Sequence, residues 1–338
     1  MIFNPVIEVG DKKIGNDHDV FIVAEIGPNH NGKIDKAFEL ICMASEAGAD
    51  AVKFQSFLAD HLLIETDPMY KWTKSVEMPE YWYPEIIQCA RDNNLIFFST
   101  ATNETTIDWL EKYGTHMYKI ASAHVNHIPV IQYASQTQKP IILSTGFSYF
   151  GEIEKAARTV YEQKNKNLSI LHCVSDYPTN PHDVNLNFIP TLKDYFNVPV
   201  GFSDHTEQYD IAVAAVAKGA LIIEKHITFS KKAQGPDHFY ALEPFEFKSM
   251  VDSIRRVEKA LGASRKKLTN QEMARRKSGR RTLHAIYDLS PGDIISNENT
   301  RLLRPGDGIG IHNINITLGR QIKNFVKKFQ PITWEDLS

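Results

Sequence analysis

Eight short apolar runs, each followed by a helical pattern, are the feature of this sequence that most limits its fold. The runs are rich in β-branched residues, and in the segments that follow them apolar residues recur at spacings of three and four, as in an amphipathic helix. The predicted strands are residues 21–26, 51–55, 96–100, 117–121, 140–145, 168–173, 198–202 and 220–226. The predicted helices are residues 34–47, 83–92, 104–112, 128–136, 152–162, 186–195, 209–218 and 244–261.

Eight strand–helix units are the number at which a parallel sheet closes on itself. An open, doubly wound sheet is the alternative architecture, but it usually contains fewer units and has a glycine-rich turn after its first strand, which this chain lacks. We therefore predict an α/β fold, a TIM (β/α)8 barrel, within residues 1–262, with a short N-terminal extension before the first strand at residue 21.

The composition changes after Gly262. Residues 264–281 read SRKKLTNQEMARRKSGRR, a basic and polar stretch that we expect to be a solvated helix, a linker or both, rather than a nucleic-acid patch. Residues 282–338 contain two Pro-Gly-Asp turns between short apolar segments, which predicts a small β-rich domain. The expected organisation is a barrel over 1–262, a linker over 263–281 and a small domain over 282–338.

Bulk properties narrow the class of protein. A net charge of −3 does not indicate a nucleic-acid-binding protein, which is usually basic. No apolar run approaches the roughly 18–20 residues that span a membrane. The first residues lack the charged start and apolar centre of a signal peptide. Three cysteines show no metal-type spacing, and Cys42 and Cys89 fit helical patterns as small buried residues. We expect a cytoplasmic protein without nucleic-acid or membrane partners.

Polar residues gather where the predicted strands end. In an eightfold barrel the loops after the strands converge on one mouth, which is where such barrels carry their chemistry. Any single strand-end serine, threonine or lysine is most simply a helix cap or a solvated charge. Polar groups on all eight strands, however, would be costly to bury without a ligand. The residues are Glu25, Lys53, Gln55, Ser99, Thr100, Lys119, Ser122, His124, Ser144, Thr145, His172, Ser175, Tyr177, Ser203, Asp204, His205, Thr206, Glu224, Lys225 and His226.

The residue types indicate the ligand. Lys53 and Lys119, together with nearby serine hydroxyls, suit a phosphate or a carboxylate. His205 and His226 end neighbouring strands, so their imidazoles can converge on a metal ion that keeps open positions. Glu25, on the first strand, would lie beside the last strand once the barrel closes. A Schiff-base aldolase is the competing interpretation, but it needs one lysine in an apolar setting rather than two among hydroxyls.

An ordered set of motifs resembles the sialic acid (N-acetylneuraminate) synthase family over nearly the whole chain. The motifs are FIVAEIGPNHNG, GADAVKFQSF, YKIAS, STG, HCVSDYPTNPHDVNL, GFSDHT, IEKHIT and GPDH, and RPGDGIG in the tail resembles the family's antifreeze-like (SAF) domain. The resemblance implies a TIM barrel followed by that domain. It also implies condensation of phosphoenolpyruvate with an N-acetylmannosamine-type sugar, a divalent metal (Mn²⁺, with Mg²⁺ or Co²⁺ as alternatives) and a homodimer swapped through the SAF domain.

The same resemblance assigns expected roles to individual residues. His205 and His226 match the metal ligands, and Glu25 matches the carboxylate beside the reacting carbons. Arg304 matches an arginine that the small domain inserts into the partner's barrel, where it contacts the acceptor sugar. The other acceptor-contacting positions are Gln55, Tyr177 and Asp237. The positions that match the phosphoenolpyruvate-binding set are Lys53, Thr100, Lys119, Ser122, Ser144 and Ser203.

Two departures bear on the acceptor sugar. After YKIAS many sialic acid synthases have Gly-Glu, whereas this chain has Ala123 and His124, and Ser175 stands where the sialic acid pattern has asparagine. N-acetylneuraminate is the expected product, with a legionaminic or pseudaminic acid synthase that uses a 6-deoxy-diacetamido hexose as the alternative. A carbohydrate-binding accessory protein without activity is the non-enzyme alternative, but binding alone would not require both histidines, both lysines and Arg304 together.

Overall fold

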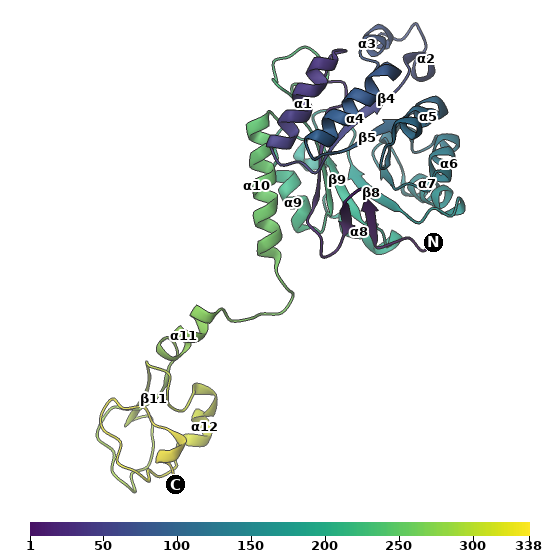
Figure 1. Ribbon diagram of the computed structural model, residues 1–338. Coiled ribbons are helices and arrows are strands. Elements are labelled where there is room, and N and C mark those ends of the chain that lie inside the picture. Colours follow the sequence, from purple (N-terminus) through teal and green to yellow (C-terminus); the bar gives the residue numbers. More distant parts are fainter. The chain divides into compact units, whose positions relative to one another are not determined.

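The computed structural model describes residues 1–338 and divides into two compact units, Met1–Gly262 and Ala263–Ser338 (Figure 1). Each unit has its own hydrophobic core. No helix in either unit combines the length and apolar character that crossing a membrane requires.

The first unit is built on eight parallel strands that form a closed barrel, as predicted. The last strand pairs with the first, so that His226 lies opposite Glu25 in the ladder. Each observed strand begins and ends within two residues of its predicted run. The strands are β3 (Phe21–Glu25), β4 (Ala51–Ser56), β5 (Ile96–Ala101), β6 (Tyr118–Ile120), β7 (Ile141–Ser144), β8 (Leu168–Cys173), β9 (Val200–Asp204) and β10 (Ile222–His226).

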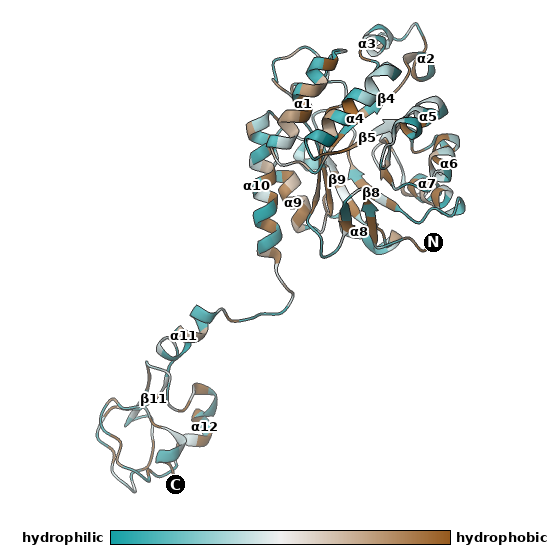
Figure 2. Ribbon diagram, viewed as in Figure 1, coloured by the Kyte–Doolittle hydropathy of each residue, from teal (hydrophilic) through white to brown (hydrophobic).

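Eight helices cover the outer face of the barrel (Figure 1). In α10 the buried residues Phe247, Met250, Val251 and Ile254 recur at spacings of three and four, so one stripe of the helix packs inward. Figure 2 shows this helix with mixed hydrophobic and hydrophilic colouring, whereas α9 is brown along most of its length. The helices are α1 (Ile34–Glu46), α4 (Tyr83–Asp92), α5 (Glu104–Tyr113), α6 (Ile128–Gln136), α7 (Phe150–Glu162), α8 (Phe188–Phe196), α9 (Asp210–Ala217) and α10 (Pro244–Leu261).

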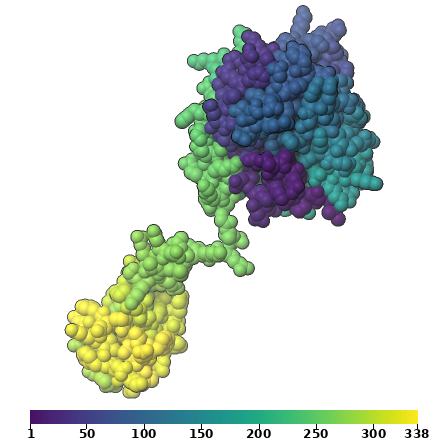
Figure 3. Space-filling model, in the orientation of Figure 1, coloured from purple at the N-terminus to yellow at the C-terminus, as the bar shows by residue number.

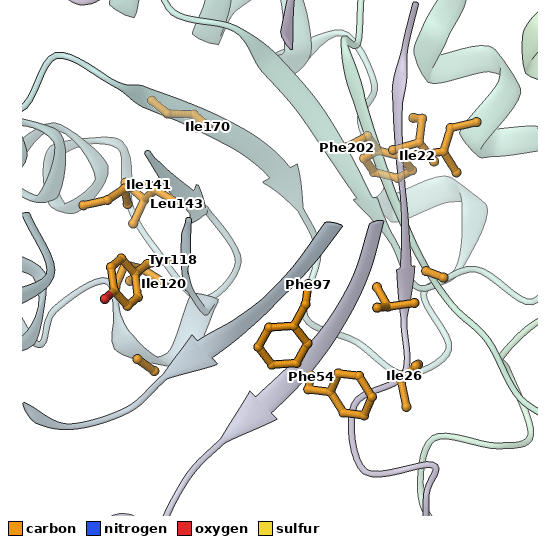
Figure 4. Packing of buried hydrophobic residues seen from close by; sticks show 14 of the residues in the cluster. Ile22, Ile26, Phe54, Phe97, Tyr118, Ile120, Ile141, Leu143, Ile170 and Phe202 are labelled. Carbon is orange, nitrogen blue, oxygen red and sulfur yellow. The ribbon is translucent and has the colours of Figure 1, made fainter. Parts of the chain in front are cut away.

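The main core lies between the strands and these helices. Figure 4 shows residues from several strands in this layer, including Ile22, Phe54, Phe97 and Phe202. Burying each such side chain stabilises the fold by roughly 1.5–3 kcal/mol relative to leaving it in water. Since successive residues of a strand point to opposite faces, the alternate residues are left to fill the inside of the barrel.

A hairpin of β1 (Val6–Val9) and β2 (Lys12–Gly15), which the sequence did not predict, closes one end of the barrel. Its residues Ile7, Val9 and Ile14 pack with apolar residues from the beginnings of the barrel strands, such as Phe21 and Ile96. In Figure 3 these first residues are the darkest purple atoms of the barrel unit. The inside of the barrel is therefore apolar at the N-terminal ends of the strands, and only the opposite end is left for a polar ligand.

Other features of the first unit also differ from the prediction. The loop after β4 contains two short helices, α2 (Ala59–Leu62) and α3 (Tyr70–Ser75), and a 3₁₀ turn, η1 (Glu80–Trp82). The prediction that Cys42 is buried is wrong: its side chain is exposed, and Cys89 is only partly buried. Cys42 follows the buried Ile41, and one residue turns a helix by about 100°, which carries Cys42 off the buried stripe.

The second unit begins with the basic stretch, part of which is the exposed helix α11 (Asn270–Gly279), capped by Thr269 and Glu272. An antiparallel pair of strands follows, β11 (Thr282–Ala285) and β12 (Thr300–Leu303). The core of the second unit consists of apolar side chains from residues between Leu283 and Leu337. The remaining short elements are η4 (Ile311–Asn313), α12 (Ile314–Thr317) and η5 (Trp334–Asp336).

Candidate active site at the open end of the barrel

A cavity of about 290 Å³ opens at the carboxyl ends of the strands, opposite the hairpin. It brings together residues from all the barrel strands, which lie far apart in the chain. Eleven of the thirteen predicted site residues line it: Glu25, Lys53, Gln55, Thr100, Lys119, Ser122, Ser144, Tyr177, Ser203, His205 and His226. Asp237 and Arg304 are the two that do not.

Strand register explains why these side chains meet. Glu25 lies opposite Lys53 on one side and His226 on the other, and Thr100 lies opposite Lys119. Residues level with one another in a barrel point to the same side. Thr100 is also level with Gln55, so the polar groups face inward at two successive levels near the strand ends.

Several other strand-end polar residues point the opposite way, into the helix layer. Asp204 and Lys225 form a fully buried ion pair, 3.0 Å between Oδ2 and Nζ, and the same ammonium donates to the carbonyl oxygen of Gln208 at 2.9 Å. His172 packs edge-on against Phe188, 5.5 Å between ring centroids. These residues stabilise the fold and its loops rather than the cavity, because the two-residue period of a strand sends every second side chain outward.

Four charged side chains form a continuous cluster on the cavity floor. Lys53 Nζ lies 2.6 Å from Glu25 Oε2 and 3.7 Å from Glu224 Oε1. Lys119 Nζ donates to both carboxylate oxygens of Glu224 at 2.6 Å, and Ser203 Oγ donates to Oε1 at 2.9 Å. All four charged residues are buried.

Glu224 was not among the predicted site residues. The signal that could have found it was local: it precedes His226 by two positions on one predicted strand, so both side chains share the inner face. The spacing of residues in the sequence could not show that Glu224 contacts Lys53 and Lys119, which lie on other strands.

The surroundings move the pKa values of the two carboxyl groups in opposite directions. Burial and the neighbouring charge of Glu224 raise the pKa of Glu25, against the opposing effect of Lys53. Burial alone would also raise the pKa of Glu224, but the charges of Lys119 and Lys53, with hydrogen bonds from Lys119 and Ser203, lower it to about 2. Glu224 is therefore ionised at neutral pH, whereas Glu25 holds a proton more readily than an exposed glutamate.

Hydroxyl groups line the cavity wall next to the lysines. Ser144 Oγ is buried and has no hydrogen-bond partner within the protein, as expected of a group whose partner is a ligand. Ser122 Oγ accepts a hydrogen bond from the backbone N–H of Gly146 at 3.0 Å. A Cβ at position 146 would lie only 2.1 Å from Ser175 Oγ, so the close approach of these hydroxyls requires glycine there.

The two histidines are neighbours, with 5.5 Å between ring centroids. His205 Nδ1 donates to the Val174 carbonyl oxygen at 2.9 Å, which leaves the lone pair on Nε2 free. Burial, together with the nearby positive charges of Lys53, Lys225 and Lys119, lowers the pKa of His226 well below its usual value, so this imidazole is neutral. Its Nδ1 is buried without a hydrogen-bond partner. These features fit metal ligands. No group of three or more His, Cys, Asp or Glu side chains is arranged to hold an ion, and metal binding by the two imidazoles stays a prediction.

The residues predicted to contact the acceptor sugar lie in different places. Gln55 Nε2 donates to Glu25 Oε1 at 2.7 Å, and the Tyr177 ring lies 4.3 Å from the His205 ring. Asp237 Oδ2 lies 3.6 Å from His226 Nδ1, beside this imidazole and outside the cavity lining. Arg304 is an exposed residue of the second unit, so the barrel unit alone does not contain it.

Two further histidines at this end of the barrel have different surroundings. His30 is buried, accepts a hydrogen bond from the Gly32 N–H at 3.1 Å and packs edge-on against Trp82 at 5.6 Å. Burial lowers its pKa to about 4, so it is a neutral residue that shapes the first loop. His124, by contrast, lines the cavity, and its buried Nδ1 has no partner. The structure thus leaves His124 free to meet a ligand.

Comparison with known proteins agrees with this architecture. The sequence profile of the NeuB family matches residues 40–266. An uncharacterized protein, MJ1065, of Methanocaldococcus jannaschii is 40% identical, with 98% of each chain covered. The N,N'-diacetyllegionaminic acid synthase of Legionella pneumophila is 37% identical, with 97% of each chain covered.

A solved structure is similar in both sequence and fold. The N-acetylneuraminic acid (sialic acid) synthetase of Leptospira borgpetersenii superposes with a TM-score of 0.77 at 33% identity, and the match covers 81% of this chain and 95% of the other. The two enzymes are named for different products, a legionaminic acid and a sialic acid. Similarity of this kind therefore identifies a family of sugar-acid synthases without selecting one product.

Proposed function

This chain belongs to the NeuB family, and from that premise we propose that it condenses phosphoenolpyruvate with an N-acetylmannosamine-type sugar and water, giving a nine-carbon 2-keto acid and phosphate. The observation that carries the proposal is the joint placement of Lys53, Lys119 and the two histidines in one cavity. Ammonium groups suit a phosphate-bearing substrate, and a metal held by imidazoles suits an aldehyde acceptor beside it.

The chain's own residues would bind and orient the phosphorylated substrate. Lys53 and Lys119 supply ammonium donors, and the hydroxyls of Ser144 and Ser122 face the same space. Thr100 and Ser203 complete the set. Fixing both reactants in one cavity favours attack of the phosphoenolpyruvate methylene carbon on the aldehyde, because the encounter no longer costs translational freedom.

His205 and His226 would hold a divalent ion, Mn²⁺ first and Mg²⁺ or Co²⁺ as alternatives, which when bound polarises the carbonyl oxygen of the sugar as a Lewis acid. Glu25 lies opposite His226 in the ladder, and its raised pKa suits a group that takes and returns a proton. We assign to Glu25 the positioning of the water that adds to the carbon bearing the phosphate. Gln55 holds Glu25 in place through its hydrogen bond.

We propose N-acetylneuraminate as the product, with Gln55, Tyr177, Asp237 and Arg304 contacting the acceptor. Legionaminic acid is the second candidate, with a pseudaminic acid product as a further variant. The specific observations in favour of the second candidate are the similarity to a legionaminic acid synthase and the free Nδ1 of His124 in the cavity. The Arg304 contact would come from a homodimer swapped through the SAF-like second unit.

The test is release of phosphate from phosphoenolpyruvate with a panel of acceptors, with and without a chelator. The panel contains N-acetylmannosamine and 6-deoxy-diacetamido hexoses, and mass spectrometry identifies the product. Metal-dependent release with one of these sugars is expected. An aldolase or a carbohydrate-binding accessory protein would release none, so the absence of phosphate with every sugar in the presence of Mn²⁺ would refute the proposal.

A further inference from the structure

The carboxylate of Glu224 accepts hydrogen bonds from Lys119 and Ser203, two residues that the proposed function assigns to phosphoenolpyruvate binding. Lys119 Nζ donates to both of its oxygens at 2.6 Å, and Ser203 Oγ donates to one of them at 2.9 Å. Lys53 Nζ lies 3.7 Å from the same oxygen. Three of the six residues expected to bind phosphoenolpyruvate therefore already face a carboxylate of the protein.

The carboxylate of Glu224 cannot easily leave this place. Its residue lies within β10 and is level with Ser203 on one neighbouring strand and Val23 on the other, so strands on both sides hold its backbone. Its side chain is 5% exposed. An incoming phosphate group must therefore share Lys119 and Ser203 with Glu224.

The charges of the cluster also cancel in part. The negative charge of Glu224 offsets one of the two positive charges of Lys53 and Lys119, so the cavity floor attracts an anion less than the two lysines alone would. A phosphate monoester brings about −1.5 to −2 charges. A phosphate at this place would therefore gain less electrostatic attraction than the two lysines alone would provide.

We infer that Glu224 is a positioning residue that competes with phosphate for Lys119 and Ser203 and so promotes the release of inorganic phosphate after each turnover. The inference rests on the proposed function, since it takes Lys119 and Ser203 as phosphate ligands. In the resting site Glu224 holds the Lys119 ammonium in place. When phosphate departs, Glu224 regains the donors that phosphate had shared.

The test measures binding of inorganic phosphate to the full chain by isothermal titration calorimetry with Mg²⁺ present. Glu224→Gln keeps the shape of the side chain and removes its charge, and we expect phosphate to bind at least about tenfold more tightly, a difference of 1.4 kcal/mol. The KM for phosphoenolpyruvate and kcat should fall together, because product release becomes slow. Equal or weaker phosphate binding by the folded variant would overturn the inference.

Matched variants show whether tighter phosphate binding comes from the loss of Glu224 itself or from a change in total charge or in folding. Glu246 lies on the outer helix α10, and its carboxylate pairs with Lys231. Because this pair is not part of the cavity, Glu246→Gln should leave phosphate binding unchanged. Glu224→Asp withdraws the carboxylate by one methylene and should tighten phosphate binding by about threefold, an intermediate effect on the same scale. Circular dichroism checks that each variant is folded.

The wild-type chain provides a measurement that does not depend on any variant. Inorganic phosphate should inhibit it only at millimolar concentrations, and micromolar inhibition would overturn the inference. If the proposed function is wrong, the wild-type chain releases no phosphate from phosphoenolpyruvate with any acceptor sugar, and this result differs from a failure of the Glu224 inference. If the wild type turns over and Glu224→Gln binds phosphate no more tightly, only the role of Glu224 is refuted.

Discussion

Glu25 and Glu224 flank one ammonium group: Lys53 Nζ lies 2.6 Å from Glu25 Oε2 and 3.7 Å from Glu224 Oε1. The other lysine, Lys119, contacts Glu224 and makes no direct ion pair with Glu25. This asymmetry lowers the pKa of Glu224 to about 2 and leaves burial to raise that of Glu25. Two carboxyl groups with opposite pKa shifts suit different tasks, one as a fixed counter-charge and the other in proton transfer.

Replacing Glu25 with glutamine tests its proton-transfer role. We expect Glu25→Gln to lower kcat by roughly 10²–10⁴-fold, the usual contribution of general acid–base catalysis. Phosphoenolpyruvate should still bind, because Lys53 and Lys119 remain. Phosphate release gives kcat and calorimetry gives binding, with Glu246→Gln as the control for loss of one carboxylate. A kcat within threefold of wild type would contradict the assignment.

His226→Ala tests the metal site. The variant should lose metal-dependent turnover and should bind Mn²⁺ at least about tenfold more weakly, because it lacks one of the two proposed imidazole ligands. Calorimetric titration of Mn²⁺ into the apoprotein measures binding independently of activity. His18→Ala changes an exposed histidine and is the control. Full activity or unchanged Mn²⁺ affinity in His226→Ala would remove this residue from the metal site.

Arg304→Ala tests the contribution of the second unit. If Arg304 reaches the acceptor in a partner's barrel, its loss should raise the KM for the sugar by roughly tenfold or more, as expected for a lost charge-assisted hydrogen bond. The thermal unfolding of the barrel should not change. Arg301→Ala, an exposed arginine on β12, is the matched control. The same KM and kcat in Arg304→Ala as in wild type would count against the swapped dimer.

His30 should make the stability of the barrel depend on pH. Its pKa is about 4 in the folded chain and 6.5 when unfolded, so only the unfolded chain takes up a proton between these values. Its contribution is complete above pH 6.5 and is lost as the pH falls toward 4, about 2 kcal/mol by pH 5. Urea unfolding followed by tryptophan fluorescence at pH 7.5 and 5.0 measures this loss.

The matched variant for that measurement is His30→Asn, which keeps a hydrogen-bond acceptor but cannot take up a proton. Its stability should fall less than that of wild type between the two pH values, by about 2 kcal/mol. His182→Asn changes an exposed histidine and should lose stability with pH as wild type does. An identical pH dependence in wild type and His30→Asn would show that His30 is not the titrating group.

Much of the site could be predicted because strands have a simple period. Lys53 and Gln55 are two residues apart, and both line the cavity. The same rule could have separated Glu224, which points inward, from Lys225, which points into the helix layer. The hairpin was missed because β1 and β2 are only four residues each, too short for a clear pattern.

Local patterns in the sequence were sufficient for the eight strand–helix units, since hydrophobic periodicity depends only on residues near one another in the chain. They could not reveal that Lys119 and Glu224, which are 105 positions apart, share two hydrogen bonds. Nor could they show that closure of β10 onto β3 places His226 level with Glu25. Those relationships follow from the register around the closed barrel, so the charge balance of the cavity and the pKa values of its carboxyl groups were decided only by tertiary structure.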